Sequence, residues 1–292
     1  MATRLSDNVE AIAGRAIAVL SERPSGLFTD IDGTISPMAP RPDEALVEPA
    51  AREALRRIEQ YLDLTGIVTG RALDVAQGLV QLPALAYVGN HGLEWSIGGI
   101  HEDNPAALAS RDGLREALAE IGSAATRLEL AEGLLLEDKR LSATVHYRQT
   151  PSPERFLEEM LPILTAVALE HDLQLVPGRM IMELRPSTGV SKGTALRDII
   201  QRFGLKGVVF SGDDISDVEG FEVLRHLRDA GTIDALIIGV VGAETPVQVR
   251  NASDVQVANP TEMAALLGGI AARLEDRARV VPESTGSAGS SA

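Results

Sequence analysis

Five short apolar segments, each ending in polar or glycine residues, constrain the fold of this 292-residue chain most strongly. Such short runs are typical of buried strands. Helix-period segments lie between them, for example residues 49–61, where Pro49 precedes a stripe of apolar side chains. Strands that alternate with helices predict a parallel α/β sheet. We expect the strands at residues 26–30, 64–69, 84–88, 208–211 and 235–238.

The middle of the chain follows a different pattern. Residues 141–148 and 180–185 alternate apolar and polar side chains, as half-buried strands do, and helices are expected at residues 105–122 and 153–171. This combination predicts an α+β insert with an antiparallel sheet. We therefore expect a core formed by residues 1–100 and 179–282, an inserted domain at residues 101–178, and a disordered tail rich in Ser, Gly and Ala at residues 283–292.

The charge balance excludes several function classes. Lysine and arginine number 27 against 42 acidic residues, a net charge of −15, so the chain lacks the basic excess that nucleic acids or anionic membranes recruit. Cysteine is absent, so a metal would need oxygen or imidazole ligands. No apolar run approaches the roughly 20 residues of a membrane-spanning helix, and charges interrupt the first twenty positions. We expect a cytoplasmic protein with a small-molecule partner, and the oligomeric state stays open.

The strongest chemical signal is the sequence DIDGT at residues 30–34, directly after the first expected strand. One carboxylate of such a pair can attack and coordinate a cation while the other exchanges a proton with a leaving group. Gly33 lets the backbone turn tightly beside an anion. A turn capped by Asp, without chemistry, is the alternative interpretation of this segment taken alone.

A second acidic segment, GDDISD at residues 212–217, follows the fourth expected strand. Its oxygens suit a hard cation such as Mg²⁺. Ligands of parallel sheets bind at the carboxyl ends of strands, so Asp30 and Asp213 should meet at one edge. Their like charges would raise the pKa of at least one carboxyl in the absence of a metal. Asp214 or Ser216 could instead cap the following helix.

Two further segments carry groups that suit a phosphoryl ester. Lys192 precedes an amphipathic helix, and Thr69 and Arg71 follow the second expected strand. A lysine and a hydroxyl beside a phosphoryl group would stabilise the charge that develops during its transfer. Taken alone, the pattern around Lys192 favours a solvated lysine at a helix start, and Arg71 could be a surface charge.

In chain order, these segments resemble the four motifs of the haloacid dehalogenase superfamily of phosphohydrolases. The resemblance implies a Rossmann-like core in which the insert is a C2 cap. It implies that Asp30 is a nucleophile that forms an aspartyl phosphate, and that Asp32 protonates the leaving oxygen and later activates water. It also implies catalytic roles for Thr69 and Lys192. Magnesium would bind to Asp30, the main-chain oxygen of Asp32 and Asp213, with Asp214 and Asp217 beside them.

Four more segments are similar to the trehalose-6-phosphate phosphatase family, over about residues 26–225: GNHGLE at 89–94, EDK at 137–139, HYR at 146–148 and ELRP at 183–186. The resemblance implies Mg²⁺-dependent hydrolysis of trehalose 6-phosphate to trehalose and phosphate, in trehalose biosynthesis. It implies substrate contacts from the core edge and the cap, whose charged groups would pair with sugar hydroxyls. The expected substrate-binding residues are Gly70, Arg71, Asn90, His91, Glu94, Glu137, Lys139, His146, Arg148 and Glu183.

Several alternatives remain at this point. His146 and Arg148 either support Lys139 or face solvent. The substrate could be another glycosyl phosphate, of a sucrose or glucosylglycerol type. A phosphomutase that returns the phosphate is a further alternative, as is a sugar-phosphate sensor without catalysis.

Overall fold

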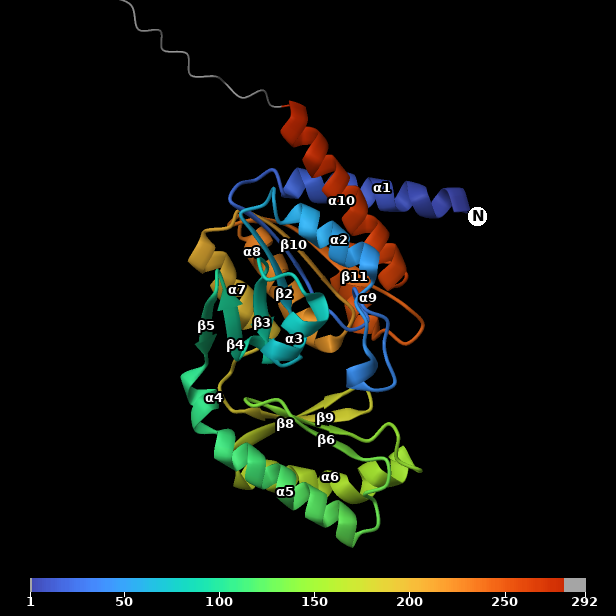
Figure 1. Cartoon of the computed structure of the whole chain (residues 1–292), viewed down its shortest axis with the longest axis vertical. Helices are drawn as coiled ribbons and strands as arrows, with labels where there is room; N and C mark the ends of the chain where they lie inside the picture. The colour runs from blue at the N-terminus through green and yellow to red at the C-terminus, as the bar shows by residue number, and fades with distance from the viewer. Residues whose placement is uncertain (1, 281–292) are drawn as a thin grey trace, which may run out of the picture.

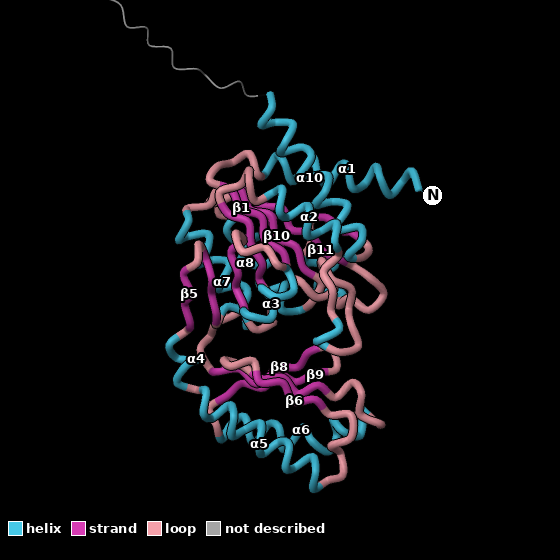
Figure 2. The backbone as a smooth tube through the Cα atoms, in the orientation of Figure 1, coloured by secondary structure: helices cyan, strands magenta, loops and turns pink. Residues whose placement is uncertain are grey.

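The computed structural model describes residues 2–280, which form two bodies that each contain a sheet (Figures 1 and 2). The larger body, the core, contains an eight-stranded sheet in the order β12-β11-β10-β1-β2-β3-β4-β5. Neighbouring strands from β12 to β3 are parallel, and β4 and β5 are added antiparallel. The strands are β1 (Ser25–Thr29), β2 (Leu64–Val68), β3 (Ala86–Gly89), β4 (Glu94–Ile97), β5 (Ile100–Asp103), β10 (Gly207–Gly212), β11 (Asp234–Val240) and β12 (Val255–Val257).

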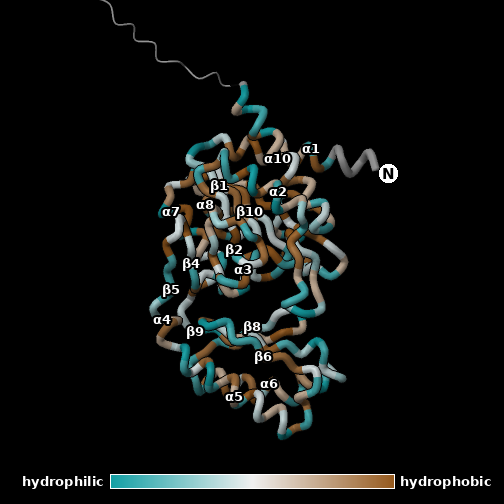
Figure 3. Tube along the Cα trace, in the orientation of Figure 1, coloured by the Kyte–Doolittle hydropathy of each residue, from teal (hydrophilic) through white to brown (hydrophobic). Residues whose placement is uncertain are grey.

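Helices cover both faces of the core sheet because successive strand residues point to opposite faces. Leu27 joins the apolar cluster on one face, beneath α1 (Ala2–Val19), α2 (Pro49–Ile58), α3 (Leu73–Val80) and α10 (Pro260–Val280). Phe28 joins the cluster on the other face, beneath α7 (Lys192–Phe203), α8 (Ile215–Asp229) and α9 (Val247–Ala252). Figure 3 shows hydrophobic segments gathered along these central strands. The expected α/β class with a parallel sheet is confirmed.

The smaller body, the cap, is a four-stranded antiparallel sheet in the order β6-β7-β9-β8. Its strands are β6 (Leu135–Asp138), β7 (Ala143–His146), β8 (Leu173–Gly178) and β9 (Ile181–Pro186). The apolar face of this sheet packs on α5 (Arg111–Arg127) and α6 (Pro153–Glu170). The alternation of side chains then turns Thr144 and Glu183, which pair across β7 and β9, to the opposite face.

The strand pairing suggests different ends for the insert from those expected from the sequence pattern. The boundary expected at residue 178 falls inside the cap sheet, because β9 pairs with both β7 and β8. At the other end, β5 belongs to the core sheet, joined to β4 by a hairpin at Gly98 and Gly99 with φ of 58° and 79°. We propose that the cap comprises about residues 104–187, beginning at α4 (Pro105–Ala109). The pairing of distant strands is invisible to local periodicity, which explains the difference.

Two other expectations concern the ends and the surface of the chain. The tail expected at residues 283–292 lies outside the described residues. Within residues 2–280, no helix combines the length and the apolar content that crossing a bilayer requires.

Candidate active site

A cavity of about 720 Å³ lies between the carboxyl edge of the core sheet and the polar face of the cap sheet. Both bodies contribute to its walls, so a ligand would contact core and cap together. Most of the residues expected from the sequence line it: Asp30, Asp32, Thr69, Gly70, Arg71, His91, Glu137, Lys139, His146, Arg148, Glu183, Lys192, Asp213 and Asp214.

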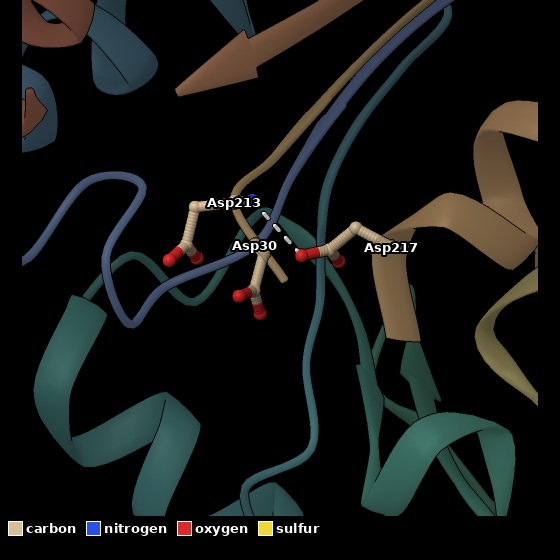
Figure 4. Close-up of side chains that lie close together, drawn as sticks. All are labelled: Asp30, Asp213 and Asp217. Carbon is tan, nitrogen blue, oxygen red and sulfur yellow. Dashed lines mark hydrogen bonds between the residues drawn. The ribbon is translucent and has the colours of Figure 1, made fainter. Parts of the chain in front are cut away.

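Three carboxylates meet at the core end of the cavity. Parallel pairing of β1 with β10 places Thr29 opposite Ser211, so the acidic segments that follow these strands emerge side by side. One oxygen from each of Asp30, Asp213 and Asp217 lies within 4.8 Å of the others, and all three residues are buried (Figure 4). The structure therefore brings together acidic groups that are more than 180 residues apart in the chain.

Lys192 is the cation of this cluster. Ser191 caps α7 in a capping box, which places Lys192 at the first helical position. Its Nζ lies 3.1 Å from Asp30 Oδ1 and 2.7 Å from Asp217 Oδ1. Burial alone would lower the pKa of Lys192, but these two carboxylates raise it, so the side chain stays charged. The solvated lysine considered from sequence is thus a fully buried ion-pair partner.

The carboxyls themselves carry strongly shifted pKa values. Burial, together with the charges of Asp217 and Asp32, raises the pKa of Asp30 to about 7 against the opposing charge of Lys192. Burial, with the charges of Asp217 and Asp30, raises the pKa of Asp213 well above its usual value. Like charges held together away from water produce these shifts.

The donor set fits a divalent cation bound by oxygen. Asp217 is already committed, because it accepts hydrogen bonds from Lys192 and from the backbone N–H groups of Asp213 and Asp214, the latter two at 3.0 Å. Asp30 and Asp213 are left with negative charge that Lys192 does not fully balance. Hard carboxylate oxygens of this kind suit Mg²⁺. Asp32 was expected beside the metal through its main-chain oxygen, and its carboxylate does not join this acidic cluster.

The Asp32 carboxylate instead forms a two-point ion pair with Arg71. Arg71 Nε and Nη2 donate to the two oxygens at 2.6 and 2.7 Å, and Nη1 donates to the carbonyl oxygen of Pro42. Burial by itself would lower the pKa of Arg71, but Asp32 raises it. Thr69 lies beside this pair, and its Oγ1 accepts from Arg71 N at 3.3 Å. Arg71 therefore orients Asp32 towards the cavity and is not a free surface charge.

The cap end of the cavity holds a second buried charge network around Glu183. Lys139 Nζ lies 3.0 Å from Glu183 Oε1, His91 Nε2 lies 3.1 Å from Oε2, and Arg185 donates to the same carboxylate. Burial by itself would raise the pKa of Glu183, but its contacts with His91, Lys139 and Arg185 hold it well below the usual value. Lys139 also donates to the carbonyl oxygen of Gly70 at 3.1 Å, which links the cap to the core.

Two other cap side chains complete the polar wall. His146 Nε2 lies 2.7 Å from Glu137 Oε2, and Arg148 donates to the carbonyl oxygen of Arg179 at 3.1 Å. Both His146 and Arg148 line the cavity, so they are not simply solvated residues on the outer face.

His91 should make the protein sensitive to acid. Burial lowers the pKa of His91 from 6.5 to about 4. Below pH 6.5 the unfolded chain binds a proton at this ring that the folded chain excludes until about pH 4, so stability falls as the pH falls through this window. Between pH 6.5 and pH 4, we expect the free energy of unfolding to decrease by about 3 kcal/mol more in the wild type than in His91→Asn.

Urea unfolding at matched pH values measures this difference. Asparagine tolerates the left-handed backbone of His91, where φ is 57°. His101→Asn, at an exposed position, controls for the loss of a histidine. An equal loss in wild type and His91→Asn would contradict the assignment.

Asn90 and Glu94 were expected to bind substrate, but the structure does not bring them to the cavity wall. Both are buried, and the Asn90 amide donates to Glu94 Oε2 at 2.6 Å and to the carbonyl oxygen of Lys139 at 2.9 Å. Glu94 also accepts from Leu73 N and from Arg140. With their polar atoms occupied in this way, we propose that Asn90 and Glu94 position Lys139. Asp217, which is also absent from the wall, contacts Lys192 and the backbone N–H of Asp213.

Two arginines of the cavity were not singled out from sequence. Arg185 lies in the ELRP segment, where Glu183 alone was selected, although alternation along β9 places both on one face. Arg179 lies in the turn between β8 and β9, and its Nη2 reaches Asp213 Oδ2 at 3.5 Å. A single arginine in a turn carries no pattern that would have found it.

Comparisons with known proteins are consistent with this geometry. A family model described as trehalose-phosphatase matches residues 28–258. A trehalose-phosphate phosphatase of Mycobacterium bovis is 30% identical over 267 residues, which cover 86% of this chain and 66% of the relative. An uncharacterized glycosyl hydrolase of Mycobacterium tuberculosis is 32% identical over 215 residues, which cover 71% of this chain and 16% of the relative. The chain thus spans 66% or less of the length of these relatives.

Solved structures share the fold. One, described as a trehalose-6-phosphate phosphatase related protein, superposes with a TM-score of 0.72 at 23% identity, covering 86% of this chain and 99% of the other. The C-terminal domain of a Candida albicans trehalose-6-phosphate phosphatase also gives 0.72, at 17% identity, covering 89% and 96%. At these identities the likeness concerns the architecture of core and cap.

Proposed function

Because this chain belongs to the trehalose-phosphatase family, we propose that it hydrolyses trehalose 6-phosphate to trehalose and phosphate with Mg²⁺ as cofactor. The observation that carries the proposal is that one cavity has different functional groups at its core end and at its cap end. Asp30, Lys192 and Asp213 at the core end suit a phosphoryl group, and Glu137, Lys139 and Glu183 at the cap end suit sugar hydroxyls.

Asp30 is the nucleophile in this proposal. Its oxygen attacks phosphorus as the bond from phosphorus to the sugar oxygen breaks, and Asp32 gives its proton to that leaving oxygen. Water then attacks the aspartyl phosphate, Asp32 takes the proton from the water, and the bond from phosphorus to Asp30 breaks. Lys192 contacts Asp30 at 3.1 Å and favours its ionised form. Arg71 holds Asp32 through two hydrogen bonds, which orients it for both proton transfers.

Magnesium would be held by Asp30, Asp213 and the main-chain oxygen of Asp32. When bound, it supplies positive charge that stabilises the transferring phosphoryl group. The net charge of −15 opposes the approach of an anion, so this local charge and that of Lys192 must attract the phosphate.

The cap end supplies selectivity. Glu183 and Lys139 are each more than nine-tenths buried, and a sugar that leaves such groups unpaired binds poorly. We propose that Glu137, Lys139 and Glu183 bind sugar hydroxyls, with His91, His146 and Arg148 orienting them.

A panel of sugar phosphates tests the proposed function. We expect phosphate release from trehalose 6-phosphate with Mg²⁺ and its loss with a chelator, and lower kcat/KM for sucrose 6-phosphate, a glucosylglycerol phosphate and glucose 6-phosphate. Preference for one of the other esters would reassign the substrate within the same chemistry. Return of the phosphate to another position of the sugar, without release, would indicate a phosphomutase. Binding without turnover would indicate a sensor.

Gly33 should be essential for the placement of Asp213. A Cβ at Gly33 would lie 2.1 Å from Asp213 Oδ2, and the backbone φ there is 77°. We expect Gly33→Ala to lower the rate of phosphate release about 100-fold or more, because displacing a reacting group by about 1 Å has that effect. Gly231→Ala is the matched control, since its φ is 67° and nothing lies within 4 Å of the new Cβ. A Gly33→Ala variant as active as Gly231→Ala would contradict the role of Gly33 in placing Asp213.

A further inference from the structure

Arg179 is an arginine of the cavity that contacts the acidic cluster of the core only at long distances. Lys192, Arg71 and Lys139 each contact a carboxylate at 3.1 Å or less. Arg179, by contrast, has one hydrogen bond from its side chain among the described residues, to Asp213 Oδ2 at the long distance of 3.5 Å. Its other near carboxylate oxygen, Asp214 Oδ1, is 3.9 Å away. Most of its five N–H donors are therefore available to a ligand.

The position of Arg179 suits an anion held on Asp30. Asp213, which Arg179 contacts, has an oxygen within 4.8 Å of oxygens of both Asp30 and Asp217. Asp213 thus links the Arg179 guanidinium to the acidic cluster in which Asp30 would hold a phosphoryl group. The planar fork of an arginine can donate two parallel hydrogen bonds to phosphate oxygens, which a lysine cannot.

The turn that carries Arg179 is held in place by the cap itself. Arg148 donates to the carbonyl oxygen of Arg179 at 3.1 Å, and Tyr147 N donates to the carbonyl oxygen of Met180 at 3.3 Å. The Arg179 side chain remains 21% exposed, so it can adjust its position towards a ligand. The backbone of Arg179 is held by hydrogen bonds while most donors of its side chain are free within the described part of the chain, as suits a residue that binds substrate.

We propose that Arg179 binds the non-bridging phosphoryl oxygens of the substrate and thereby brings a cap-borne charge to the reacting group, an assignment that rests on the proposed phosphatase function. The proposed sugar contacts and the phosphate contact of Arg179 then both come from the cap, since Arg179 lies in the turn between β8 and β9. When cap residues bind the sugar, they also place Arg179 beside the phosphate. Recognition of the sugar therefore promotes reaction at the phosphoryl group.

Calorimetry with the two products separates this role from a structural one. Inorganic phosphate and trehalose are titrated separately into the Mg²⁺-loaded full chain. We expect Arg179→Gln to weaken phosphate binding about tenfold or more, as loss of charged hydrogen bonds does, and to change trehalose binding less than twofold. Arg179→Lys should recover part of the phosphate affinity, because it restores the charge without the planar fork.

The control is Arg115→Gln, an exposed arginine on α5 of the cap, which should leave both affinities unchanged. Phosphate affinity within twofold of wild type in Arg179→Gln would overturn the proposal. So would an equal loss of phosphate and trehalose affinity, since that would mean Arg179 only holds the cap in place. If wild type released no phosphate from any sugar phosphate while phosphate affinity still depended on Arg179, the proposed function would fail, and Arg179 would remain a phosphate-binding residue without a role in hydrolysis.

Discussion

Replacing Asp30 with asparagine should lower kcat for phosphate release on the order of 10⁴-fold or more, the scale seen when an enzyme loses its nucleophile. Asparagine fills the same volume in this buried position and removes a carboxylate whose pKa is already raised to about 7 by burial. The fold should therefore persist, and the variant should still bind the sugar phosphate. Phosphate release and substrate binding, measured on the same preparation, test both statements.

A matched change supports the interpretation of this variant. Asp112→Asn removes a carboxylate that is 92% exposed on the cap, and it should leave turnover unchanged. An Asp30→Asn variant with activity within tenfold of wild type would exclude Asp30 as the attacking group.

Of the substitutions proposed here, replacing Lys192 with methionine should cause the largest decrease in the free energy of unfolding. Methionine keeps the length of the side chain, but Asp30 and Asp217 then lose the ammonium group that contacts both. Breaking a buried ion pair on one side costs about 3–5 kcal/mol, because charges remain buried without a partner. Phosphate release should also fall by about 100-fold or more, as it does when a group that stabilises developing charge is removed.

Urea unfolding with a chelator measures the stability loss, and repeating it with Mg²⁺ adds a second reading. Mg²⁺ should reduce the loss, because a cation held by Asp30 and Asp213 in the folded state neutralises Asp30, one of the two carboxylates that Lys192 contacts. Lys206→Met, at an exposed position, is the control and should change stability little. Equal stability of the two variants would show that the carboxylates do not depend on Lys192.

Local patterns in the sequence were enough to predict the core of the site. The strands that became β1, β2, β3, β10 and β11 were recognisable because a strand buried on both faces is apolar along its whole length. The acids after β1 and β10 had to meet, because carboxyl ends of neighbouring parallel strands share one edge. The proximity of Asp30 and Asp213 was therefore predictable from residue type and position.

Contacts between distant segments were not accessible in this way. Three contacts each join segments that no local pattern relates: the ion pair of Arg71 with Asp32, the hydrogen bond from Asn90 to the carbonyl oxygen of Lys139, and that from Arg179 to Asp213. The cap end that we propose differs from the expected one for the same reason, since β9 pairs with β7 across more than 30 residues.

The amino-acid sequence alone thus determined the α/β class, the strand ends and the types of reactive group, because periodicity records which side chains are buried along a single element. Tertiary structure decided which charges pair, which polar groups are occupied by the protein itself and which stay available to a ligand. Those outcomes depend on distances of a few ångströms between elements, and the electrostatic energy of a buried group changes steeply over such distances.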